Sequence, residues 1–222
     1  MTDTPPCGFE KLSPGWYISA TKIEHQNTGK VKKHTNSEKE TDIYRVDPDD
    51  IIVSVSDNWS AFAEHNCGGD ALRAENIVGT SLWDGIHGSE TIHLYSIILE
   101  KTRERLCTPT FPFRCDSPRL RRYFTLALIP EKNGAIEFQS RLERIEQRDP
   151  VRIMEPETNR SKELIRICSM CRKMALSDDK WEEVETALQE LKYFEEDPLP
   201  MISHGFCPSC YDAAMAEIDQ ME

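Results

Sequence analysis

The chain has 222 residues and a formal net charge of −12 at pH 7, with 38% hydrophobic and 30% charged residues. This acidic balance disfavours general binding to nucleic acid or to anionic lipid, because the field of the whole chain repels phosphate groups. No apolar stretch approaches the roughly 20 residues that a membrane-spanning helix needs, so we expect no membrane association.

The first 46 residues are rich in Lys, Asn, Thr and Glu, with few apolar residues at a strand or helix period. Such a segment cannot bury enough surface to offset the entropy of ordering it, and we predict that residues 1–46 are mobile. The start, MTDTPPCGFEKLSPGW, has no basic region followed by an apolar one. A secretory signal is therefore not expected, and we predict a cytoplasmic protein.

A packed domain is predicted from residue 47 to residue 149. The β-branched run IIVSVS at 51–56 predicts a strand. The segment SETIHLYSIILEKTRERL at 89–106 predicts the long helix of the domain, with Ser89 as its N-cap. The face of this helix that the spacing predicts to be buried consists of Ile92, Tyr95, Ser96 and Leu99.

Three further strands are predicted after this helix, at 108–115, 121–130 and 134–146. In RRYFTLALIP, large apolar residues alternate with others at a period of two, and EKNG supplies a turn into the next strand. The order of a strand, helices and then an antiparallel meander describes an α+β domain with helices on one side of an antiparallel sheet.

This region resembles a PAS domain over residues 47–149. The resemblance lies in the order of DNWSAFAEHN, ENIVGTSLWDGI, the helix at 89–106 and the hairpin FPFRCDSPRLRRYFTLALIP. It implies a five-stranded antiparallel sheet flanked by helices. PAS domains are sensory and docking modules, often dimeric, that sometimes enclose a small ligand between sheet and helices. The resemblance thus implies a protein partner or a homodimer through this domain, and a small-molecule ligand of unknown identity as a further option.

Haem-type PAS domains place an axial histidine on the long helix, where this sequence has His93. Nothing else in the sequence specifies a porphyrin pocket, so we interpret His93 as a surface or hydrogen-bonded side chain of the helix. A haem-dependent sensor remains an alternative. The space between helices and sheet is expected to be an ordinary core, filled by Trp83, Phe124, Phe138 and their neighbours.

A basic cluster lies around the connection between the strands predicted at 108–115 and 121–130, and it comprises Arg114, Arg119, Arg121 and Arg122. Arginine forks suit carboxylates and phosphates. Because Asp116 can pair locally, we interpret the cluster as an exposed, partly paired turn. A contact with an anionic ligand or partner is the alternative.

Residues 150–166 contain two prolines and mixed charge without a core pattern, and we predict a linker. Two Cys-x-x-Cys pairs follow, Cys168 with Cys171 and Cys207 with Cys210. In each pair a tight turn brings both sulfurs to the same side, so two pairs supply four soft ligands to one ion. Four thiolates suit tetrahedral Zn²⁺, and we predict a structural zinc site in a small zinc-ribbon-like module at 167–222.

The gap between the two pairs exceeds the 15–20 residues of a minimal ribbon. The segment SDDKWEEVETALQELKYF at 177–194 has apolar residues at helical spacing and predicts an inserted amphipathic helix. After Cys207, Pro208 occupies a first-turn position and predicts a short terminal helix.

Other chemistries stay open for these thiols. A redox pair with a depressed pKa is one alternative, and a rubredoxin-like iron site is another. His204 lies three residues before Cys207 and is placed beside the ligands or in the turn, because four thiols already complete the site. The remaining cysteines Cys67, Cys107 and Cys115 are interpreted as small apolar core residues or inert thiols, and Cys7 lies in the segment predicted to be mobile.

The C-terminal pattern, ICSMCRKM followed by a tryptophan-bearing acidic segment and SHGFCPSC, resembles an element appended to PAS domains in bacterial sensory proteins. The resemblance covers residues 167–210. This sequence differs from the usual element by its RKM after the first pair and by a longer acidic middle. The resemblance implies a signalling protein and leaves the conserved partner surface open.

We therefore predict a non-enzymatic signalling module with no catalytic residues, which acts by association. A transcriptional regulator acting through the zinc module is an alternative, but residues 160–222 hold 7 basic and 14 acidic residues, a net charge of −7, and phosphate binding needs the opposite sign. A thiol-redox sensor is another alternative. An enzyme is disfavoured, because four protein ligands leave the metal no open position for substrate or water.

Overall fold

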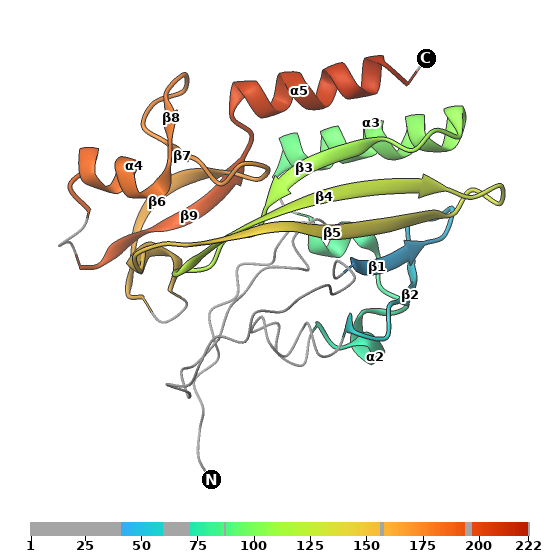
Figure 1. Cartoon of the computed structure of the whole chain (residues 1–222), viewed down its shortest axis with the longest axis horizontal. Coiled ribbons are helices and arrows are strands. Elements are labelled where there is room, and N and C mark those ends of the chain that lie inside the picture. Colours follow the sequence, from blue (N-terminus) through green and yellow to red (C-terminus); the bar gives the residue numbers. More distant parts are fainter. Residues whose placement is uncertain (1–40, 60–71, 87, 156–157, 194–196, 222) are drawn as a thin grey trace, which may run out of the picture.

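The computed structural model describes residues 41–59, 72–86, 88–155, 158–193 and 197–221, which form two β-sheets and the helices packed on them (Figure 1). The predicted α+β class is confirmed. Residues 1–40, and with them Cys7, lie outside the described residues, as does Cys67. No helix in the described ranges is both long enough and apolar enough to cross a membrane.

The first sheet has five antiparallel strands in the order β2-β1-β5-β4-β3, as expected for the sheet of the packed domain. Long strands β4 and β5 lie at its centre and form a hairpin (Figure 1). The strands are β1 (Thr41–Val46), β2 (Ile52–Val55), β3 (Thr110–Arg114), β4 (Leu120–Pro130) and β5 (Ile136–Gln147). Four of these fall where the sequence predicts a strand.

Strand β1 corrects the predicted boundary at residue 47, because it lies within the segment 1–46 that was expected to be mobile. It pairs with both β2 and β5, so it is an interior strand of the sheet. Its burial alternates with a period of two, and Tyr44 and Val46 are almost completely buried. The strand has only six residues and ends a long polar segment, so its alternating pattern is too short to stand out from that segment.

Helices cover one part of this sheet: α2 (Ala74–Ile77), the 3-10 helix η3 (Leu82–Gly85) and α3 (Ser89–Arg105). The predicted long helix is confirmed, but its N-cap is Gly88 rather than Ser89. Gly88 has φ of +89°, a conformation that side chains with a Cβ rarely adopt. The predicted buried face is wrong in part, because Ile92 and Ser96 are exposed. The buried apolar residues of α3 are Leu94, Tyr95, Ile98 and Leu99.

Aromatic stacking dominates the core of the first sheet. Tyr44 on β1 stacks on Phe138 of β5 with ring centroids 4.4 Å apart. Phe113 on β3 stacks on Phe124 of β4 at 5.1 Å. The predicted core residues Phe124 and Phe138 are buried, whereas Trp83 is half-buried and donates from Nε1 to Asp50 Oδ2 at 2.9 Å.

The second sheet has four strands in the order β8-β7-β6-β9, with β6 and β9 pairing in parallel. Its elements are η4 (Arg152–Met154), β6 (Arg160–Cys168), β7 (Met174–Ala175), β8 (Trp181–Glu182), α4 (Val184–Glu190), β9 (Leu199–Gly205) and α5 (Pro208–Asp219). The terminal helix α5 was predicted. The parallel pair joins segments more than thirty residues apart in the chain, and no local sequence pattern predicts this pairing.

Two sequence predictions are corrected in this region. The segment 150–166 is more than a linker, because Val151 and Ile153 are buried in a second apolar core and β6 begins at Arg160. The inserted helix predicted at 177–194 is shorter, since α4 starts at Val184 and Trp181 lies on strand β8. Pairing with β7 holds Trp181 in an extended conformation, although the apolar residues around it are spaced as in a helix.

The C-terminal segment also shares the core of the first sheet. The apolar cluster that contains residues of α3, β3 and β4 also includes Phe206, Ala214 and Ile218 of α5, and Met221 just after α5. In Figure 1, α5 runs beside α3 along the β3 side of the first sheet. The segments predicted at 47–149 and 167–222 are therefore packed against each other.

Candidate metal centre

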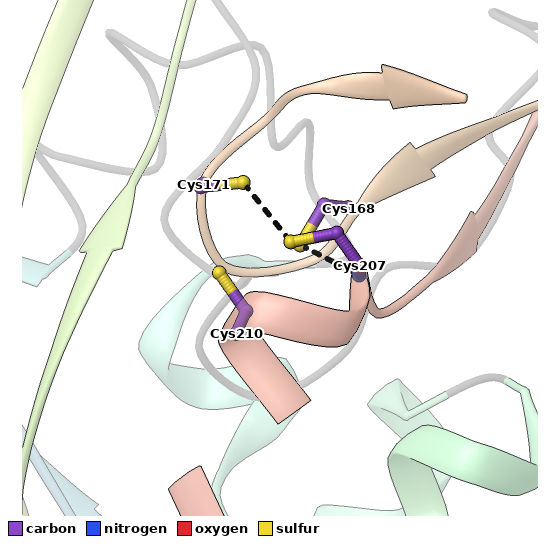
Figure 2. Close-up of side chains that lie close together, drawn as sticks. All are labelled: Cys168, Cys171, Cys207 and Cys210. Carbon is purple, nitrogen blue, oxygen red and sulfur yellow. Dashed lines mark hydrogen bonds between the residues drawn. The ribbon is translucent and has the colours of Figure 1, made fainter. Parts of the chain in front are cut away.

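The four predicted ligand cysteines come from two turns that the second sheet brings together. Cys168 is the last residue of β6, and Cys171 lies in the turn before β7. Cys207 is the N-cap of α5, and Cys210 lies in its first turn, after Pro208 at N1. Because β6 and β9 pair in parallel, both strands end at the same edge, and the two turns meet there (Figure 2).

The four sulfur atoms form a compact cluster. All four Sγ atoms lie within 4.8 Å of one another, and Cys171 Sγ is 3.7 Å from Cys207 Sγ. A tetrahedral ion with metal–sulfur bonds of about 2.3 Å separates its ligands by about 3.8 Å, so this spacing fits a four-thiolate site. The six cysteines in the described part of the chain are free thiols. These four cysteines could therefore hold one metal ion.

Backbone hydrogen bonds shape the first turn around its sulfurs, and we call residues 168–173 the knuckle. Cys168 donates its amide to the carbonyl of Lys173 at 2.8 Å, and Arg172 donates its amide to the carbonyl of Cys168 at 3.1 Å. Arg172 has φ of +62°, the left-handed conformation that closes the turn. The amide of Cys207 donates to Cys168 Sγ at 3.4 Å, which links the two turns and favours a thiolate at Cys168.

The thiols perturb one another strongly. Hydrogen bonds from the thiols of Cys171 and Cys210 lower the pKa of Cys168 to about 2, with support from the amides of Cys207 and Cys171. The same bond to Cys168 raises the pKa of Cys171 to about 12, and bonds to Cys168 and Cys171 raise the pKa of Cys210. Without a cation these hydrogen bonds thus favour a thiolate at Cys168 and protonated thiols at Cys171 and Cys210. A divalent cation would displace the remaining thiol protons, which makes metal binding dependent on pH.

The cluster is closed on its inner side. Cys168 and Cys207 are buried, whereas Cys171 and Cys210 are half-buried. Trp181 packs against the cluster, in the same apolar group as Cys168 and Cys207. His204 is on β9, opposite Ile167 of β6, and the group of potential ligands contains the four cysteines without it. With four sulfurs available, the arrangement suits a structural ion more than a catalytic one.

A buried arginine follows the first cysteine pair. Arg172 is 6% exposed, and burial lowers its pKa to about 10, an effect that electrostatic interactions with Cys115, Asp116 and Cys168 partly oppose. Its charge therefore lies between the thiol cluster and the corner that joins β3 to β4.

That corner carries the basic cluster, and the prediction of an exposed turn is wrong for Arg114. The side chain of Arg114 is 8% exposed and contacts both Asp116 and Glu183, the latter at 2.9 Å. Burial opposes the charge of Arg114, but its hydrogen bonds to these carboxylates outweigh burial and raise its pKa. Arg119 alone of the cluster is exposed, and Arg122 donates to the carbonyl of Cys115 at 2.8 Å.

Arg148 and Glu185 complete this ionic network, which joins the two sheets. Arg121 contacts Glu185 at 2.9 Å, and Arg148 contacts Glu185 at 3.2 Å and Asp116 at 3.5 Å. Glu183 is the N-cap of α4 and Glu185 lies in its first turn, between the two cysteine pairs in sequence. No local pattern points to Arg148, Glu183 or Glu185, because their partners lie tens of residues away in the chain.

The haem candidate His93 is exposed on α3. A cavity of about 20 Å³ lies on the buried side of that helix, and His93 does not line it. Its lining residues are Leu94, Tyr95, Ile98, Phe111, Phe113, Leu126, Leu128, Ser169, Met170, Phe206 and Ala214. This cavity has room for about one water molecule.

No family model matches this chain, and neither does any curated protein. Among solved structures, the chain is similar to a domain of an HTR-like protein from Haloarcula marismortui. The identity is 15% and the TM-score 0.34, and the similarity covers 47% of this chain and 98% of that domain. At this level the similarity supports no conclusion about function.

Proposed function

We propose that this protein is a non-enzymatic signalling module, in which a PAS-like domain for sensing or docking is coupled to a structural Zn²⁺ site that presents a protein-interaction surface. The convergence of four cysteine sulfurs from two distant turns carries this proposal. The partner is a protein or a second copy of this chain, bound through the PAS-like domain. A small ligand of that domain remains an open part of the proposal.

Zinc fits the donor set better than the alternatives do. Four thiolates at tetrahedral spacing are typical of structural Zn²⁺ sites, which keep no open position for substrate. Magnesium and calcium prefer oxygen ligands, which the cluster lacks among the described residues. Iron accepts the same four sulfurs and is distinguished from zinc by its visible absorption.

The architecture supports the PAS-like part of the proposal. A five-stranded antiparallel sheet with a long helix packed on it is what the sequence resemblance implies. The net charge of −12 argues against phosphate binding as the output. Output through protein association is the remaining route for a chain of this composition.

Native mass spectrometry of the full chain, with an absorption spectrum, tests the metal assignment. We expect one Zn²⁺ per chain and no visible absorption. Zinc present at a thousandfold its dissociation constant would stabilise the fold by about 4 kcal/mol, so chelation should lower the melting temperature clearly.

Single substitutions locate the site. Cys168→Ser and Cys207→Ser should each lose the metal, whereas the matched change Cys107→Ser, at a cysteine outside the cluster, should keep it. Visible absorption typical of an iron–thiolate centre would change the assigned metal from zinc to iron. A protein that binds no metal, or in which these cysteines form disulfides, would overturn the proposal.

A further inference from the structure

Helix α5 covers an apolar surface that belongs to the first sheet. Ala214 and Ile218 of α5 are spaced i and i+4 and form one stripe with Met221, which lies just after the helix, and all three are buried. The stripe packs in one cluster with residues of α3, β3 and β4, while Asp212 and Asp219 on α5 are exposed. Figure 1 shows α5 lying along this side of the molecule.

Polar contacts with the edge of β3 accompany this packing. The amide of Thr110 donates to Glu217 Oε1 on α5 at 3.2 Å. The amide of Arg114 donates to the carbonyl of Met170 in the knuckle at 2.7 Å. The knuckle and α5 together therefore cover the free edge of the five-stranded sheet, which would otherwise expose unpaired amides.

The surface beneath α5 is incompletely packed. The cavity of about 20 Å³ lies there, between residues of α3, β3 and β4 on one side and Ser169, Met170, Phe206 and Ala214 on the other. Ser169 is 2% exposed, and within the described part of the chain its hydroxyl has no hydrogen-bond partner. Incomplete packing at this surface weakens the closed arrangement.

The cysteine cluster holds the first turn of α5 in place. Cys207 and Cys210 are at the start of the helix, and Cys168 and Cys171 flank Ser169 and Met170 in the knuckle. A metal ion bound by all four therefore ties α5 to the knuckle at the border of the cavity. A helix of 12 residues is marginal in water without tertiary support.

We propose that α5 is a metal-latched lid: bound metal keeps it closed over α3, β3 and β4, and loss of the metal frees it and uncovers this apolar surface and the β3 edge at Thr110. The inference rests on the proposed metal site and adds to it a regulated surface. The occupant of that surface in the closed state is α5 itself.

Amide hydrogen exchange on the full chain, zinc-loaded and EDTA-treated, tests the lid. After chelation, exchange in residues 209–219 and at the amide of Thr110, which donates to Glu217 of α5, should accelerate about tenfold or more, as expected for local opening. Amides in the β4–β5 hairpin should keep their protection. Unchanged exchange in α5, or an equal loss throughout β4 and β5, would overturn the lid and leave the metal site intact.

Two variants separate the lid from the latch. Ile218→Ser weakens the buried stripe and leaves the thiols untouched, so α5 should exchange faster while the chain still binds one Zn²⁺. Asp212→Ser, on the exposed side of α5, is the matched control and should behave as the unmodified chain. If Ile218→Ser leaves exchange in α5 unchanged, the stripe does not hold the lid. If the unmodified chain binds no Zn²⁺, the proposed function itself is wrong, and the measured metal content shows this independently of the exchange data.

Discussion

Different interactions stabilise each of the two sheets of this protein. The five-stranded sheet has a long central hairpin and an aromatic core, so its stability comes from apolar burial and local pairing. The four-stranded sheet has two strands of only two residues each, and its edge carries four thiols and one side of an ionic network. The comparison teaches that the second sheet adds the thiol cluster and ionic contacts to an apolar core of its own, where the first depends mainly on packing.

The largest effect is expected from a substitution that disrupts the packing of the first sheet. Phe138 is fully buried and stacks on Tyr44, so Phe138→Ala should lower the free energy of unfolding by about 3–5 kcal/mol. The control on the same strand is Ile145→Ala, because Ile145 is 51% exposed and should cost no more than about 0.5 kcal/mol. Denaturant unfolding measures both. Loss of bound metal from the folded Phe138→Ala variant would contradict the separation of the two regions.

The next effect concerns the contact between the sheets. Arg114→Met leaves the carboxylates of Asp116 and Glu183 buried or half-buried without this partner, and breaking such a pair costs about 3 kcal/mol or more. The exposed pair of Arg141 with Glu143 supplies the control, since Arg141→Met should cost less than about 1 kcal/mol.

A double-mutant cycle sharpens this test. Combining Arg114→Met with Glu183→Gln should cost less than the sum of the two single changes, because both remove the same contact. Strict additivity would show that the contact does not join the sheets energetically.

The smallest effect depends on pH. Burial favours the neutral form of Glu185, but hydrogen bonds from its own amide and from Arg121, with the charges of Arg148 and Arg121, lower its pKa below the usual value. A lowered folded pKa gives stability that is present above the unfolded pKa, about 4.3, and is lost as pH falls through the folded pKa.

Glu185→Gln should therefore lower stability at pH 7 by less than about 1 kcal/mol, since Glu185 is partly solvated. The variant should also lose less stability than the unmodified chain between about pH 5 and pH 3. Glu163→Gln, at an exposed position on β6, is the control. Parallel pH profiles for Glu185→Gln and the unmodified chain would contradict the role of this carboxylate.

The sequence predicted elements best where the signal was local. Strands β3, β4 and β5 and helix α3 were found because alternation, a turn sequence and helical spacing fall within a short window. Strand β1 was missed because its six residues end a long polar segment, and β6 and β9 because their pairing is parallel and distant. The apolar spacing around Trp181 overpredicted a helix, since β7 recruits that residue into a strand.

The sequence alone determined which thiols can meet a metal, because two residues between cysteines confine each pair to one turn. It also determined the central hairpin of the first sheet through its period of two. Only the tertiary structure decided that α5 covers the first sheet, that Arg114 is buried against Glu183, and that Ser169 faces a cavity. These features join residues far apart in the chain, and the packing of whole elements, which local spacing does not encode, brings them together.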